Sequence, residues 1–210
     1  MDSLITAYYI SGIIVAFCAI IALSQIIIGK KQLVFNEENR KKEQQRDMVK
    51  CTAEQVAFLS KDVVSAHDKL YNVLKPEDIS LLQEENLTIS NNSISIKKGI
   101  TLNDEERTKI VNARREAVDF YNNLEIFSSY FVMKIADENI AFHLIGEDFC
   151  RMLKPYLALY LIIEGKKNKD NAVFKLFLLW HSKLETLKLT KEKRKLEEAL
   201  KKMTERTFSL

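Results

Sequence analysis

Histidines are the residues in this chain that would most readily carry acid–base or metal chemistry, and there are three of them, His67, His143 and His181. None has a second histidine or a cysteine three or four residues away, the spacing that places two metal ligands on one helix face. We expect His67 to lie on the exposed side of a long helix. The chain also has no glycine-rich phosphate loop and no serine in a nucleophile elbow. These features predict a protein that is not an enzyme and that holds neither a cofactor nor a metal ion.

RNA cleavage is a specific activity to consider, because small helical bundles can carry it. Such ribonucleases place an arginine and a histidine a few residues apart on one helix, so that both side chains reach the same phosphate. Here Arg115 lies far before His143, and Arg151 lies far before His181. We therefore expect no intact site of that kind.

One acidic side chain lies within an apolar helix face, and we expect it to be structural. Glu125 would form a polar cluster with Arg115 or Arg151, since an unpaired buried charge costs several kcal/mol. The apolar neighbours of Glu125 on that face are Phe120, Leu124, Phe127, Tyr130 and Phe131.

The N-terminal segment is the most apolar part of the chain. Leu4–Ile28 contains 25 residues without Asp, Glu, Lys or Arg, and a helix of that length would reach about 37 Å, enough for a hydrocarbon core of about 30 Å. A signal peptide would have a basic leader and a small-residue cleavage site, and neither is present. The sequence therefore predicts a transmembrane helix over residues 1–28. Because Lys30 and Lys31 follow it, the N-terminus would face outward and the rest would be cytoplasmic.

Small residues recur at helical spacing in this predicted helix, at Gly12, Ala16 and Ala19, and polar residues lie near them and at its inner end. Small side chains let two helices approach closely in lipid, although they are also common in membrane helices that do not associate. Ser24 and Gln25, near the inner end, could line a pore or reach the headgroups. The candidate assembly or pore face comprises Ser11, Gly12, Ala16, Ala19, Ser24 and Gln25.

The remaining residues predict an all-α protein, because Gly (5) and Pro (2) are too scarce for a turn-rich sheet fold. We expect a charged stalk helix over 29–55 and a helical bundle over 56–210, with an irregular insert at 76–103 that could hold a short helix or a hairpin. The first helix of the bundle would bury a face that repeats every three or four residues, namely Val56, Leu59, Val63, Ala66, Leu70 and Val73.

Capping residues predict the later helix boundaries. Asn103 and Glu106 form a capping-box pattern that opens a helix running to about Ile135. Asp137 would cap a helix over 138–163, which Pro155 should kink or divide. Asp170 and Thr190 would open the last two helices.

The charge and the aromatic residues of the chain fit more than one role. A net charge of +3 marks no nucleic-acid surface, so direct RNA binding is not favoured, although a basic helix over 188–202 could touch anionic lipid or RNA. The run of Phe174, Phe177 and Trp180 is typical of a core or a subunit interface.

Cys18, Cys51 and Cys150 lie too far apart to suggest a disulfide framework.

A family resemblance rests on Leu124-Glu125, the segment 135–140 (IADENI) and Gly146, which follow one apolar span and a charged stalk. In these features the chain resembles a bacterial family of single-span proteins with an all-helical cytoplasmic domain. Within that family it is similar to the membrane accessory proteins of type VI-B CRISPR loci that enhance the RNA-guided nuclease. The resemblance implies a degenerate ribonuclease-type bundle and an antiviral role as an oligomeric pore in the inner membrane, functionally linked to that nuclease.

Three functions remain open at this point. The first is a membrane-anchored homo-oligomer that perturbs the inner membrane during CRISPR-linked antiphage defence. The second is a membrane-tethered RNA-binding or ribonuclease-like helper. The third is a scaffold for a defence partner that forms no pore.

Overall fold

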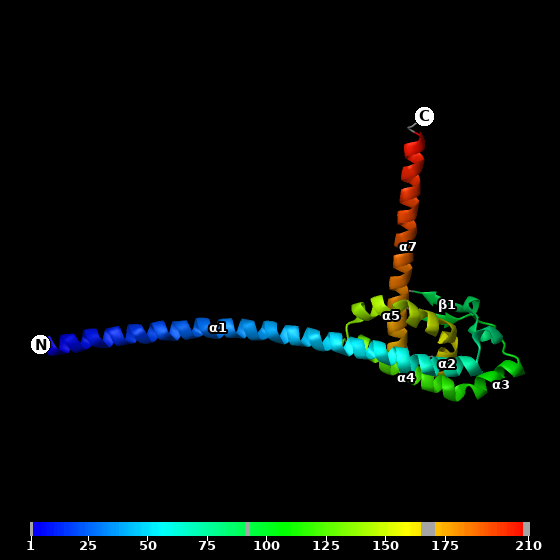
Figure 1. Ribbon diagram of the computed structural model, residues 1–210. Helices are drawn as coiled ribbons and strands as arrows, with labels where there is room; N and C mark the ends of the chain where they lie inside the picture. The colour runs from blue at the N-terminus through cyan, green and yellow to red at the C-terminus, as the bar shows by residue number, and fades with distance from the viewer. Residues whose placement is uncertain (1, 91–92, 165–170, 208–210) are drawn as a thin grey trace. The chain divides into compact units, whose positions relative to one another are not determined.

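The computed structural model describes residues 2–90, 93–164 and 171–207, and the side chains of most of residues 24–201 within them. The chain divides into two compact units, residues 1–47 and 48–210, which we describe separately. Figure 1 shows the ribbon, coloured from the N-terminus to the C-terminus. The prediction of a mostly helical protein is confirmed, since the regular structure of the described residues consists of helices apart from one short hairpin.

The first unit lies entirely within helix α1 (Asp2–Phe58). The part of the predicted stalk that lies in this unit, residues 29–47, is helical, and its side chains are almost all exposed. The predicted face of Ser11, Gly12, Ala16 and Ala19 falls on α1, but these side chains are outside the described residues. Across the described part of the chain, no helix meets the length and apolarity that a membrane span requires.

The second unit begins with the end of α1, which continues as a π-helical turn (Leu59–Val63) and then as α2 (Val64–Val73). Leu59, Val63, Ala66 and Leu70 are buried, which confirms the predicted face, but Val73 is exposed. Burial in the bundle begins before residue 56, the predicted start of the bundle, because the Thr52 side chain is already buried. Its hydroxyl accepts a hydrogen bond of 2.7 Å from the backbone N–H of Asp137.

Four further helices complete the core. In Figure 1 the first turns of α7 (Ala172–Thr207) pass between α4 (Arg114–Val132) and α5 (Glu138–Leu153), and α7 packs on both. A 3-10 turn (Lys154–Tyr156) joins α5 to α6 (Leu157–Glu164), because Pro155 has no N–H to continue α5. Trp180 lies at the centre, fully buried and ringed by aromatic side chains, namely Phe127, Phe131, Phe142 and Phe149.

Local capping sets two helix starts as the sequence predicts. The Asn103 side chain accepts from the backbone N–H of Glu106, whose carboxylate accepts in return from the N–H of Asn103. The helix does not run unbroken to residue 135, however. It ends as α3 (Asp104–Asn112), and a turn at Ala113 separates it from α4. The Asp137 carboxylate caps α5 by accepting from the N–H groups of its first turn.

The C-terminal boundaries differ from the prediction. Helix α7 is a single helix, and Asn171 caps it by accepting from the N–H of Val173 at 2.7 Å. Asp170 lies outside the described residues. Thr190 opens no new helix, because its hydroxyl donates to the carbonyl of Thr186 one turn earlier. Helix α7 therefore continues well past Trp180, the last of its buried residues in the described part of the chain.

The insert at 76–103 contains the hairpin, one of the two alternatives expected for it, and has 3-10 turns where the other alternative was a short helix. Three 3-10 turns (Pro76–Asp78, Ser80–Leu82 and Glu84–Asn86) lead into an antiparallel hairpin of β1 (Leu87–Ser90) and β2 (Ser93–Ile96). The Glu106 carboxylate accepts a hydrogen bond of 2.6 Å from the N–H of Ser80, which ties the insert to α3. The hairpin presents one apolar face to the core, formed by Leu87, Ile89, Ile94 and Ile96.

Candidate functional site

Helix α1 carries a cluster of exposed apolar side chains where the uncharged stretch meets the stalk. Ile26, Leu33 and Phe35 are 67%, 68% and 62% exposed, and Ile28 and Val34 are also more than half exposed. Ser24 and Gln25, the inner members of the predicted face, are exposed next to them. The free energy falls when large apolar groups leave water. This surface therefore fits contact with lipid or with another helix.

The predicted cluster of Arg115, Glu125 and Arg151 does not form among the described residues. The Glu125 carboxylate accepts a hydrogen bond of 3.1 Å from the Asn171 amide and a longer one from the Tyr160 hydroxyl. Arg151 pairs instead with Asp148, one turn before it on α5. A sequence pattern identifies that Glu125 needs polar partners, but it does not show which distant residue supplies them.

Arg115 lies in a separate polar hollow between the π-turn with α2 on one side and α4 on the other. The hollow has a volume of about 460 Å³. Acidic and basic side chains are mixed on its walls, so it offers no site of a single charge. The charged residues there are Asp62, Lys69, Arg115, Glu116 and Asp119.

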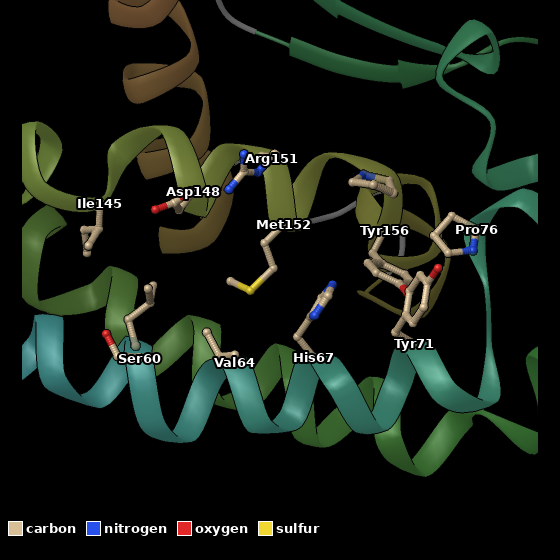
Figure 2. A pocket seen from close by; sticks show the side chains of 12 residues that line it. Ser60, Val64, His67, Tyr71, Pro76, Ile145, Asp148, Arg151, Met152 and Tyr156 are labelled. Atoms are coloured by element: carbon tan, nitrogen blue, oxygen red, sulfur yellow. Dashed lines mark hydrogen bonds and ion pairs between the residues drawn. The ribbon is translucent and has the colours of Figure 1, made fainter.

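A larger cavity, of about 540 Å³, lies between the π-turn and α2 on one side and α5 with the following turn on the other. Figure 2 shows Ser60, Val64, His67 and Tyr71 on the first wall, with Met152 reaching toward them from α5. A π-turn inserts an extra residue into a helix and is frequent at functional sites. Here it supplies Leu59 and Ser60 to the lining.

Aromatic rings form one end of this cavity. The His67 ring lies 6.2 Å from the Tyr71 ring and nearly parallel to it, and it meets Phe120 and Tyr156 edge-on at 5.7 Å each. Tyr156 is fully buried, with its hydroxyl donating to the carbonyl of Leu74 at 3.1 Å. The expectation that His67 is exposed was therefore wrong, since only 22% of its side chain is accessible.

Hydrogen-bonding groups surround the aromatic rings. The Nδ1 atom of His67 lies 3.2 Å from the Asp68 carboxylate, while the tip of the ring points across the cavity toward α5. Within the described residues, no side chain or backbone group bonds to Nε2 at that tip. On the α5 wall, Arg151 donates to Asp148, and the two side chains remain 76% and 62% exposed.

Tyr71 in the cavity lining and Cys150 elsewhere on α5 both have raised pKa values. The Tyr71 hydroxyl donates to Glu77 at 3.2 Å, and the negative charge of that carboxylate raises the pKa of Tyr71. Burial raises the pKa of the Cys150 thiol to about 12, so this thiol is a poor nucleophile at neutral pH. In the part of the chain with described side chains, no set of three or more His, Cys, Asp or Glu is grouped to hold a metal ion.

The described residues form a mostly helical protein with an uncovered apolar segment on α1 and an aromatic-lined cavity. Comparisons with known protein families, with curated proteins and with solved structures find no match. The resemblance to type VI-B accessory proteins, and with it the degenerate ribonuclease-type bundle, rests on the sequence alone and stays a prediction.

Proposed function

We propose that this protein is a non-enzymatic, membrane-anchored effector that assembles into a homo-oligomer through its N-terminal helix and perturbs the inner membrane as a pore. The N-terminus faces outward in this proposal, and the helical bundle is cytoplasmic. The family resemblance adds a biological setting, in which the oligomer enhances antiphage defence by a type VI-B RNA-guided nuclease.

The observation that carries the proposal is the uncovered apolar surface of α1. Its described apolar side chains at positions 26, 28 and 33–35 are exposed at the end of the uncharged stretch Leu4–Ile28 and just after it. A cluster of exposed apolar side chains on a single helix is unfavourable in water, and lipid or other copies of the helix would remove it from water. Because one helix cannot enclose water, a pore requires several copies.

The lining of such a pore would be polar without being charged. Leu4–Ile28 contains no acidic or basic side chain, so its polar groups are hydroxyls and one amide. A ring of charges is a common source of strong ion selectivity, and this segment has none to contribute. We therefore expect weak discrimination between small cations and anions.

Two substitutions test the assembly face. Gly12→Leu and Ala16→Leu place a bulky side chain where close helix packing is proposed. Ala7→Leu is the matched control for this close packing, because at about 100° per residue position 7 points well away from Gly12, Ala16 and Ala19. We expect the first two variants to reduce the detergent-corrected particle mass measured by light scattering, and Ala7→Leu to leave it unchanged.

A functional measurement accompanies the mass. Reconstituted into liposomes, the parent protein should release a trapped small dye, and cells that also express the nuclease should resist phage better with the parent than with Gly12→Leu. A particle that remains a monomer or dimer in several detergents would refute the pore. An oligomer without dye release would instead favour a scaffold.

A further inference from the structure

The cavity between α2 and α5 has the dimensions of a small-molecule site. Its volume of about 540 Å³ lies within the range of about 300–1,000 Å³ that is typical of such pockets. It is larger than a single planar ring needs and too small for a folded macromolecule. A ring with an attached sugar fits this size.

The lining favours a flat ligand. His67 and Tyr71 present nearly parallel rings from the α2 side, and the Met152 side chain reaches toward them from α5. Pro76 and Pro155 add rigid apolar surface. Rings and thioethers of this kind contact the face of a planar heteroaromatic group favourably, whatever its exact substitution.

The polar groups of the lining favour a ligand with both donors and acceptors at its edge. Nε2 of His67 faces the cavity without a partner among the described residues. Across from it, Arg151 uses one of its donors on Asp148, which leaves further N–H groups on the guanidinium. Asp148 itself supplies acceptor oxygens. Guanidinium and carboxylate groups recognise the complementary edges of nucleobases in this way.

The charge balance opposes an anionic ligand. Arg151 is accompanied by Asp148 on its own helix, and Glu77 lies beside Tyr71 at the aromatic end. Asp68 lies next to the His67 ring. With one carboxylate paired to the only guanidinium of the lining and two more carboxylates beside His67 and Tyr71, a phosphate group would meet repulsion as well as attraction. The base, and not a phosphate, should therefore supply most of the binding energy.

We propose that this cavity binds a nucleobase, presented either by a free nucleoside or by an unstacked base of single-stranded RNA. The base lies against His67 and Tyr71, and its edge bonds to Nε2 of His67 and to the Arg151–Asp148 pair. This binding does not depend on membrane anchoring or pore formation, so it can hold or fail separately from the proposed function.

The experiment measures binding to the full chain in detergent by isothermal titration calorimetry. The probes are adenosine, guanosine, cytidine and uridine, the matching 5′-monophosphates, a single-stranded RNA hexamer of mixed sequence, and inorganic phosphate. We expect at least one nucleoside to bind, its monophosphate to bind no more tightly, and inorganic phosphate not to bind. Tighter binding of the hexamer than of any nucleoside would identify RNA as the source of the base.

Two variants locate the site. Arg151→Ala removes an exposed side chain and should not disturb folding, and His67→Gln keeps a polar group of smaller size. We expect each to weaken binding by about tenfold, as the loss of a hydrogen bond to a charged or buried partner does. The matched controls are Arg115→Ala, in the separate hollow, and His143→Gln, exposed on α5, and they should bind as the parent does.

Three results would overturn the proposal. The first is that no nucleoside and no RNA hexamer binds at millimolar concentration. The second is binding that Arg151→Ala leaves unchanged. The third is displacement of the nucleoside by inorganic phosphate, which would show that the cavity recognises anions.

Discussion

Replacing Gly146 by alanine tests how tightly the core around Trp180 is packed. Gly146 is buried in the middle of α5, one turn after Phe142. A Cβ atom at residue 146 would lie 2.5 Å from Cδ2 and 3.3 Å from Cγ of the Phe142 ring. Because these atoms lie near the base of the ring, rotation of the far end of the side chain cannot relieve the contact.

The Phe142 ring has little space into which it can move. It is only 8% exposed, its centroid lies 6.1 Å from that of Trp180, and the Lys183 ammonium lies over it at 5.1 Å. Overpacking of a core typically costs about 1–3 kcal/mol. The intrinsic preference of a helix for alanine over glycine offsets about 1 kcal/mol of this cost. We therefore expect Gly146→Ala to lower the free energy of unfolding by about 1 kcal/mol.

Urea unfolding followed by circular dichroism and by Trp180 fluorescence measures this change, which corresponds to a fall of about 2–4 °C in the melting temperature. Gly29→Ala is the matched control, because a Cβ at residue 29 meets no atom within 4 Å, and it should not destabilise the protein. In a Phe142→Leu background, Gly146→Ala should lose most of its cost. If Gly146→Ala stabilises the parent protein, the position of the Phe142 ring described above is incorrect.

Three further predictions concern other parts of the bundle. Thr52→Val should destabilise the protein by about 1–3 kcal/mol in thermal unfolding, because the buried N–H of Asp137 would lose its acceptor, whereas Thr52→Ser should cost less. Hydrogen bonds from the N–H groups of Ser80 and Asn103 lower the pKa of Glu106 below its usual 4.5. The folded state therefore holds fewer protons than the unfolded state, so the stability from this group is complete above about pH 4.5 and is lost as the pH falls through the lower folded pKa. Urea unfolding between pH 6 and pH 3 should be less pH-dependent for Glu106→Gln, and an unchanged slope would contradict this. Cys150 should resist iodoacetamide at pH 8 until urea unfolds the protein, as measured by peptide mass spectrometry. Rapid labelling of the native protein would show that this thiol is accessible.

Several elements of the fold follow from local sequence. Asn103 with Glu106, and Asp137, mark helix starts because a capping side chain bonds to backbone N–H groups only two or three residues away. Pro155 marks the end of α5 for an equally local reason, the missing N–H. The apolar spacing along residues 59–70 identifies a buried face, since burial repeats with the helical period.

The tertiary structure alone decided which distant side chains meet. Glu125 bonds to Asn171 and Tyr160 and not to an arginine, and His67 packs among rings from α2, α4 and the turn after α5. No local sequence pattern could place His67 opposite Arg151, because the two residues belong to helices α2 and α5, which are far apart along the chain. Cavities and polar partners depend on how helices pack, and packing is a sum of many contacts between residues that are remote along the chain.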